Sequence, residues 1–300
     1  MPLVSRRDFL GVSAAAGILA WQSRATAQAS LPPICCFSKH LQFIKDYTSL
    51  AETAKALGLD GLDLTVRGGG HVLPENVETD LRKAVDAAQS AGISVPMITT
   101  NLQNGEDISA EPIMEAASKA GVHFLRVGGR EKYVSDRPIP DQLDGQIEAF
   151  RALAHLAEAH GVVCGYHNHS GRDNVGAPLW DVQRMIHEID KASFGSNFDI
   201  GHATVEGGLG GWYINARTMA SHIRMTAIKD FVWENGKVRW VPLGQGQVQL
   251  VDYFRVLKVN NFSGPISIHF EYDTSSDDAL LNDIESAVQT TRDALIEAGY

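Results

Sequence analysis

The 300-residue sequence has few cysteines and few basic residues. Its cysteines, Cys35, Cys36 and Cys164, are too few for a disulfide framework and lack zinc-finger spacing, so we expect buried free thiols. The 26 lysines and arginines are outnumbered by 36 aspartates and glutamates, which gives a formal net charge of -10. Because such a surface repels phosphate backbones, nucleic acid is not an expected partner.

An apolar run near the N-terminus is too short to span a membrane as a helix. It covers residues 9–21, whereas a spanning helix needs about 20 apolar residues. Arg6 and Arg7 precede it and small residues follow, which is the order of a twin-arginine export signal. The alternative is an uncleaved membrane anchor. We interpret residues 1–27 as a signal peptide, and we expect the mature protein, residues 28–300, to be periplasmic without a stable membrane span.

A glycine-rich phosphate-binding turn is missing after the first expected strand, which argues against a doubly wound nucleotide-binding sheet. A different unit recurs instead: a helical segment, a glycine at its end and then a β-branched strand, as in "AVDAAQSAGISVPMIT". Strands are expected at residues 34–38, 61–66, 93–99, 122–127, 162–168, 195–200, 223–229 and 265–271. Eight strands separated by helices predict an α/β fold, a single (β/α)8 TIM barrel.

Polar residues gather where the later strands end, which is where a TIM barrel carries its functional side chains. The fifth strand ends in His167-Asn168-His169, and alternation puts both histidines on one face. Asp199 ends the sixth strand, and His202 follows it.

The last two strands add further polar side chains. Lys229 and Asp230 end the seventh strand, and His269 and Glu271 share a face of the eighth. Imidazoles and carboxylates that converge on one rim suit a divalent Mn, Co, Mg or Zn ion. We therefore predict a metal site with the following ligands: His167, Asp199, His202, His269 and Glu271.

Each of these residues also has a structural alternative. His269 could hydrogen-bond a neighbouring strand end, Asp199 could cap the next helix, and Lys229 could form a loop salt bridge with Asp230. Glu271 is different, because a buried carboxylate needs a cation or several hydrogen-bond donors.

Substrate-binding candidates follow the second and seventh strands. Asp63, Arg67 and His71 could bind sugar hydroxyls, or they could belong to a solvated loop. Trp233 and Trp240 flank the hairpin sequence "ENGKV" and could stack on a sugar face, or they could pack the hairpin.

The segments "GLDGLDL", "HNH", "FDIGH", "KD" and "HFEY" resemble those of the xylose-isomerase-like TIM barrels. That superfamily includes sugar phosphate isomerases and epimerases, inosose dehydratases and AP endonucleases. In its epimerases, a Glu, an Asp, a His and a Glu from strands five to eight hold one metal ion, and the two glutamates exchange the proton. Asp199 and Glu271 match this set, whereas His167 replaces the first glutamate and Ala227 replaces the histidine. His169, His202 or His269 could restore the missing imidazole.

The resemblance implies a metal-dependent sugar isomerase or epimerase that removes a proton beside a carbonyl group, with Lys229, His167 and His169 as acid/base candidates. Since an exported enzyme meets few sugar phosphates, we expect a free sugar or a keto-sugar as substrate. A homodimer is common among related barrels. Two alternatives stay open: a lyase or dehydratase that eliminates a β-substituent from keto-sugars or 3-keto-glycosides, and a non-catalytic sugar-binding protein. The negative charge and the expected compartment oppose an endonuclease.

Overall fold

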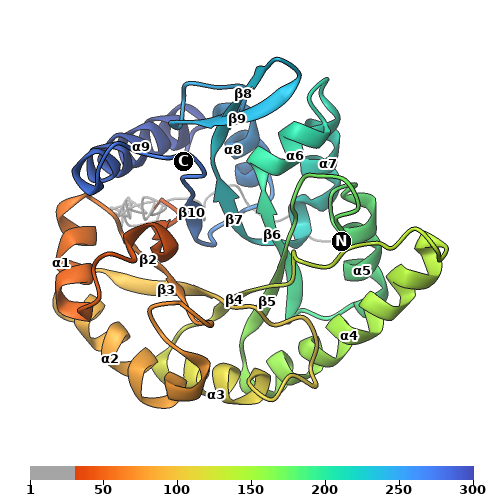
Figure 1. The fold of residues 1–300 in the computed structure, drawn as a ribbon, viewed down its shortest axis with the longest axis horizontal. Helices are drawn as coiled ribbons and strands as arrows, with labels where there is room; N and C mark the ends of the chain where they lie inside the picture. The colour runs from red at the N-terminus through yellow and green to blue at the C-terminus, as the bar shows by residue number, and fades with distance from the viewer. Residues whose placement is uncertain (1–30) are drawn as a thin grey trace, which may run out of the picture. The chain divides into compact units, whose positions relative to one another are not determined.

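The computed structural model describes residues 31–300, which form a closed barrel of parallel strands inside a ring of helices (Figure 1). The strand order is β1-β10-β7-β6-β5-β4-β3-β2, and the barrel closes between β1 and β2. This confirms the predicted (β/α)8 fold. The interpretation of residues 1–27 as a signal lies outside the described residues. Within residues 31–300, every helix is too short or too polar to cross a membrane.

The barrel strands are β1 (Ile34–Phe37), β2 (Gly61–Thr65), β3 (Ser94–Thr99), β4 (Phe124–Val127), β5 (Val163–His167), β6 (Phe194–Asp199), β7 (Ile223–Ile228) and β10 (Ile266–Ile268). The helices are α1 (Tyr47–Ala56), α2 (Val77–Ser90), α3 (Ala110–Ala120), α4 (Ile139–His160), α5 (Trp180–Ile189), α6 (Ile200–Glu206), α7 (Gly211–Met219), α8 (Leu250–Val259) and α9 (Asp277–Glu297), and the short 3-10 helices are η1 (Ser38–Leu41), η2 (Pro74–Asn76) and η3 (Ala220–His222).

Glycines end two of the helices as the sequence predicts. Gly121 and Gly161 follow α3 and α4 with φ angles of 76° and 68°, in the left-handed region that glycine adopts without a steric cost. In both places the next strand starts within a few residues, at Phe124 and at Val163. The core lies between the barrel and the helices, because each helix buries one apolar face against the strands.

The eighth barrel strand is shorter than expected. The prediction ran to residue 271, whereas β10 ends at Ile268. The His269 N–H still donates to the Ile228 carbonyl of β7 at 2.9 Å, whereas the Phe270 N–H leaves the sheet and donates to His40 Nε2 at 3.1 Å. His269 and Glu271 therefore lie just beyond the assigned strand, where both line the cavity at the mouth of the barrel.

A two-stranded hairpin, β8 (Asp230–Glu234) and β9 (Lys237–Val241), follows β7. Its turn residues Asn235 and Gly236 have φ angles of 52° and 73°, which is the pattern of a type I′ turn. The Asp230 carboxylate accepts hydrogen bonds from the backbone N–H groups of Gly244, Gly246 and Val248. Asp230 thus ties the hairpin to the following loop, while Lys229 pairs with Asp199 instead.

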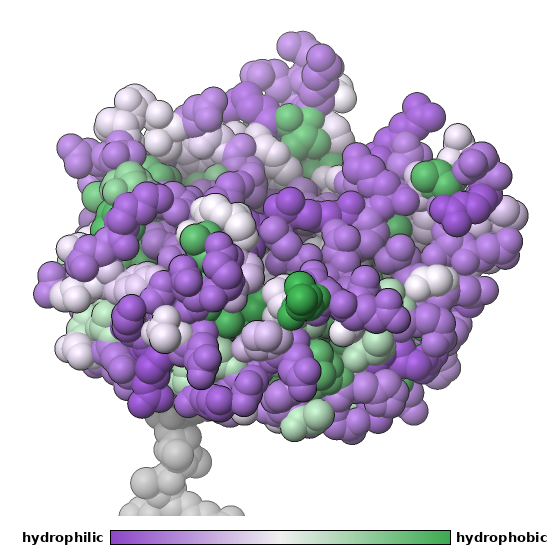
Figure 2. Space-filling view, turned by 60° about the horizontal axis from the view of Figure 1, so that its bottom comes forward, coloured by the Kyte–Doolittle hydropathy of each residue, from purple (hydrophilic) through white to green (hydrophobic). Residues whose placement is uncertain are grey.

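The cysteines are free and buried, and the face of the surface shown in Figure 2 is mostly hydrophilic, as the composition predicts. Cys35, Cys36 and Cys164 are buried and free, as expected, and burial raises the pKa of Cys164 to about 12. On the face shown in Figure 2, hydrophilic residues predominate and hydrophobic ones are scattered.

Candidate metal and substrate site

The barrel opens into a cavity of about 500 Å³ at the carboxyl ends of its strands. Seven of the candidate residues line this cavity: Arg67, His167, His169, His202, Trp240, His269 and Glu271. The other lining residues are Phe37, Lys39, Arg126, Gly129, Arg130, Lys132, Ser170 and Asn174. The cavity therefore joins loops that are far apart in the sequence.

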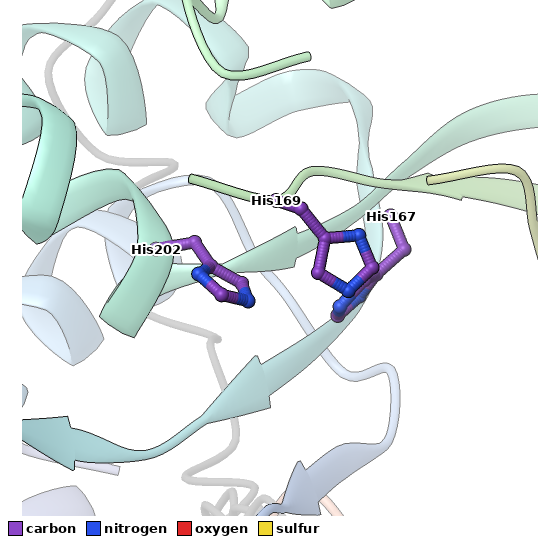
Figure 3. A group of neighbouring side chains, drawn as sticks. All are labelled: His167, His169 and His202. Atoms are coloured by element: carbon purple, nitrogen blue, oxygen red, sulfur yellow. The ribbon is translucent and has the colours of Figure 1, made fainter. Parts of the chain in front are cut away.

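Histidines converge at one side of this cavity. His167 ends β5, His169 lies two residues further on, and His202 lies in the first turn of α6 (Figure 3). In Figure 3 the His202 ring faces the rings of His167 and His169. One ligand atom from each of the three lies within 4.8 Å of the others, and the same holds for His167, Asp199 and His269. The structure thus brings together four of the five predicted ligands.

Asn168 fixes the spacing between β5 and β6 at this point. Its side-chain amide donates to the Asp199 carbonyl at 3.1 Å, and its oxygen accepts from the Asp199 N–H at 2.8 Å. This pair of bonds continues the strand ladder through a side chain. As a result, Asp199 is held beside the histidines that flank Asn168.

Asp199 uses its two oxygens in different ways. Oδ1 accepts from the His202 N–H at 2.8 Å, so the carboxylate caps α6 as one alternative foresaw. Oδ2 lies 3.0 Å from Lys229 Nζ and 3.6 Å from His167 Nε2. The same side chain therefore caps a helix and offers an oxygen to the cluster.

Lys229 is buried behind two residues of the cavity lining, His202 and Trp240. Its Nζ is 2.8 Å from His202 Nε2 and 4.8 Å from the centre of the Trp240 ring. Because an ammonium group only donates, His202 Nε2 is the acceptor and the proton of this ring sits on Nδ1. His202 Nδ1 then donates to Ser170 Oγ at 2.7 Å. A hydrogen-bonded chain thus runs from Lys229 to the cavity-lining Ser170.

The clustered imidazoles are neutral. Burial, reinforced by nearby cationic groups, lowers the pKa values of His167, His202 and His269 well below their usual range. Burial and the neighbouring His202 lower the pKa of His169 to about 2. Neutral rings keep a nitrogen lone pair, which is the form that binds metal ions.

These residues fit a divalent cation. Both ring nitrogens of His167, Nδ1 of His169, Nε2 of His269 and Oδ2 of Asp199 are buried without a hydrogen bond among the described residues. Unpartnered imidazole nitrogens beside a carboxylate oxygen are the donors that Zn, Mn or Co take. The Lys229 ammonium is a cation already present beside Asp199, although its 3.0 Å contact lacks hydrogen-bond geometry.

Glu271 lies apart from both ligand groups. Its side chain is 29% exposed at the cavity rim, and Oε2 is 3.2 Å from Lys39 Nζ. His269 takes the inner position instead, stacked on Phe37 with ring centres 4.7 Å apart.

The predicted substrate-binding residues separate in the structure. Arg67 lines the cavity, whereas Asp63 is fully buried and accepts hydrogen bonds from the hydroxyls of Thr99 and Ser267. Burial raises the pKa of Asp63 despite these bonds. Asp63 therefore holds three strands together beneath the cavity.

His71 and Trp233 also lie outside the cavity lining. The His71 ring bonds to Ser38 Oγ at 3.1 Å and to the Ile44 carbonyl at 3.1 Å, so it braces the loop after β2. Trp233 is half exposed on the hairpin, whereas Trp240 of the paired strand lines the cavity with its ring edge-on to His202.

Three residues that sequence reasoning did not single out shape the site. Arg126 of β4 lines the cavity, and Gly129 and Glu131 lie in the loop that follows. A side chain at Gly129 would collide with the His167 carbonyl oxygen and lie 2.8 Å from His169 Nδ1. The signal for Arg126 was available, because "FLRVG" places a charged residue inside an apolar strand.

Known proteins share this fold. A crystal structure of D-psicose 3-epimerase with D-tagatose, from Clostridium cellulolyticum H10, is 15% identical with a TM-score of 0.70, over 88% of this chain and 99% of that one. The IOLI protein with a bound zinc atom is 16% identical with a TM-score of 0.70, over 89% and 99%. A Mycobacterium smegmatis barrel in complex with magnesium is 17% identical with a TM-score of 0.66, over 89% and 98%.

The family comparison covers most of the chain. No curated protein sequence matches it. The family model described as xylose isomerase-like TIM barrel matches residues 51–295, from α1 to the last helix. The chain belongs to the xylose isomerase-like TIM barrel family.

Proposed function

We propose that this chain is an exported carbohydrate isomerase or epimerase that moves a proton beside a carbonyl group with the help of a divalent cation. One observation carries the proposal: buried neutral imidazoles and the Asp199 carboxylate offer unpartnered donor atoms within 4.8 Å of one another beside a cavity of sugar size. Structural neighbours described as a sugar 3-epimerase and as a zinc-bound protein support it.

The cation would be held by His167, Asp199 and His269, which come from three strand ends. When bound, it supplies a Lewis acid that stabilises negative charge on the substrate oxygen. His169 offers a further neutral nitrogen beside His167, in the other group of possible ligands. The four side chains themselves need little rearrangement, because Asn168 already fixes β5 beside β6.

Proton transfer falls to groups that face or reach the cavity. His169 lines it, and its Nδ1 has no hydrogen bond among the described residues, so this imidazole is positioned to accept a proton from the substrate. Burial lowers its pKa to about 2 in the ligand-free protein, so this role requires that bound substrate raises the pKa. The chain from Lys229 through His202 ends at the Ser170 hydroxyl, which can return a proton at a second point. Trp240 offers an aromatic wall for the sugar.

A lyase reaction is the second candidate, and one observation favours it. Glu271 is the only carboxylate among the cavity-lining residues described, and Lys39 neutralises it. A pair of glutamates that exchange a proton across the substrate is therefore missing from this lining. One base and one proton donor are enough for β-elimination from a keto-sugar.

The test combines metal content with isotope exchange. The mature protein is measured for metal by elemental analysis, and free sugars and keto-sugars are incubated with it in D2O and followed by NMR. Deuterium at the carbon beside the carbonyl identifies an isomerase or epimerase, whereas loss of a β-substituent identifies a lyase. We expect His167→Ala and His269→Ala to lose both metal and exchange, and His187→Ala, on the exposed side of α5, to keep both. Metal-free protein that binds sugar without exchange would overturn the proposal in favour of a sugar-binding protein.

A further inference from the structure

Positive charge gathers around the cavity although the chain as a whole is acidic. Glu271 is the one acidic residue in the described lining, against five basic ones: Lys39, Arg67, Arg126, Arg130 and Lys132. The whole sequence has a formal net charge of -10. The cavity therefore reverses the sign of the protein surface and favours anions.

Arg126 forms no ion pair within 4.0 Å in the part of the chain that the structure describes, and the buried Asp63 is the carboxylate that acts on it most. It is 7% exposed, lies on β4 and lines the cavity, and its Nε is buried without a hydrogen-bond partner. Burial lowers its pKa to about 10. A buried guanidinium that stays unpaired is costly. An anion inside the cavity would remove that cost.

Two further guanidinium groups share this part of the cavity. The guanidinium carbons of Arg67 and Arg126 lie 5.2 Å and 5.4 Å from the centre of the Phe37 ring. Burial lowers the pKa of Arg67, and repulsion from the nearby Arg130 lowers it further. Within residues 31–300, Arg67 and Arg130 make no ion pair. Three like charges thus face one space, and the Glu271 carboxylate at its rim pairs with Lys39 instead.

The loop that carries Arg130 is built to hold its shape. The Glu131 carboxylate accepts from the backbone N–H groups of Gly129 and Arg130 at 2.8 Å and 3.0 Å. The Tyr166 hydroxyl, from β5, donates to the same oxygen at 2.9 Å. Oε2 of Glu131 thus holds the loop in place, whereas Oε1 has no hydrogen-bond partner among the described residues, and Glu131 forms no ion pair with the arginines.

We propose that Arg67, Arg126 and Arg130 form a subsite for the oxyanion group of an acidic carbohydrate, a carboxylate or a phosphate. Guanidinium groups present paired N–H donors that match both oxyanions. The subsite adjoins the histidine cluster. The positive charge of Arg126 acts on His167 and, after burial, contributes most to lowering the pKa of that imidazole. The inference rests on the proposed function, because it takes the ligand to be the carbohydrate that the histidines act on.

The test is calorimetric binding of three probes to the mature protein: D-glucose, D-glucuronate and D-glucose 6-phosphate. We expect at least one acid to bind about tenfold or more tightly than glucose, since hydrogen bonds to charged groups have that magnitude. Whichever of the two acids binds more tightly identifies the preferred oxyanion as carboxylate or phosphate. The variants Arg67→Gln and Arg126→Met should lose the preference for the acid over glucose. The control variant Arg255→Gln, at an exposed position of α8, should keep it.

Thermal unfolding gives a second readout. Because Arg126→Met removes an unpaired buried charge, we expect it to raise the melting temperature of the ligand-free protein and to abolish the further rise caused by the acid. If this variant does not fold, Arg67→Gln, at a half-buried position, decides the question. Equal affinity for glucose and both acids, or an unchanged preference in the arginine variants, would overturn the subsite.

The two proposals can fail separately. Deuterium exchange into neutral sugars, without any preference for the acids, would uphold the proposed function and overturn the subsite. Tight binding of an acid that depends on Arg67, without exchange into any sugar, would uphold the subsite and overturn the proposed function.

Discussion

The Lys229 ammonium lies 3.0 Å from the Asp199 carboxylate, and both side chains are almost completely buried. The Lys229 ammonium also donates to the His202 ring at Nε2, and the backbone N–H of His202 donates to the other oxygen of Asp199. A single ion pair therefore joins the ends of β6 and β7 and orients a histidine of the cavity wall.

Removing the charge of Asp199 should destabilise the fold through Lys229. Asp199→Asn keeps an oxygen that can cap α6 but leaves a buried ammonium unpaired, so we expect the free energy of unfolding to fall by about 3 kcal/mol. The double variant with Lys229→Met should recover most of this loss. Chemical denaturation of the single and double variants measures both effects. Asp252→Asn, which breaks an exposed pair with Arg255, serves as the control and should change little.

Asn168 should be needed for metal binding although it is not a ligand. Asn168→Ala removes both side-chain bonds to the Asp199 backbone, so we expect a loss of about 1–3 kcal/mol in unfolding free energy. Metal content should fall as well, because the spacing of His167 and Asp199 is no longer fixed. Asn260→Ala loses one bond at the end of α8 and should keep its metal. Full metal content in both variants would contradict this role.

Gly129 should not tolerate a side chain. Its φ is 84°, and a methyl group there would collide with the His167 carbonyl and press on His169, so Gly129→Ala should lower both stability and metal content. Gly121→Ala is a matched control: its φ is 76°, with open space around the added carbon. That control should cost only about 1 kcal/mol for the left-handed backbone and leave the site intact. Similar metal loss in both variants would point to a general effect of backbone strain.

Asp181 should make stability depend on pH. Burial raises its pKa to about 6 despite bonds from the Gly176 and Val182 N–H groups and the Tyr133 hydroxyl. The folded state thus binds this proton more tightly than the unfolded chain, whose Asp pKa is about 3.9. The contribution is full below that value and is lost as the pH rises through about 6.

Unfolding of the native protein and of Asp181→Asn over this pH range measures the Asp181 contribution. The difference in unfolding free energy, native minus variant, should shrink as the pH rises. A flat difference would show that folding leaves the Asp181 pKa unchanged, and a difference that grows with pH would show that folding lowers it.

The proposed export depends on the arginine pair outside the described residues. Replacing Arg6 and Arg7 together by lysine should leave the uncleaved protein in the cytoplasm, because the twin-arginine route reads this pair. Cell fractionation with immunoblotting measures the result. Arg24→Lys keeps the pair and should be exported normally. Periplasmic, cleaved protein from the double variant would refute this route.

The sequence by itself determined the barrel. Glycines such as Gly121 and Gly161 end helices because they alone enter the left-handed region cheaply, and the β-branched runs after them form buried strands. The same local chemistry placed the Asn235-Gly236 turn and put polar residues at the strand ends, where a parallel barrel brings them to one rim.

Only the tertiary structure decided which of those polar residues face one another. Asp63 is satisfied by hydroxyls of β3 and β10, and Glu271 meets Lys39, which is 232 residues away in the sequence. The ladder of β10 lasts as far as His269, whose N–H donates to the Ile228 carbonyl at 2.9 Å, and the Phe270 N–H leaves it for His40. Strand alternation fixes a side chain's face only while the ladder lasts, and beyond its end long-range contacts fix the direction.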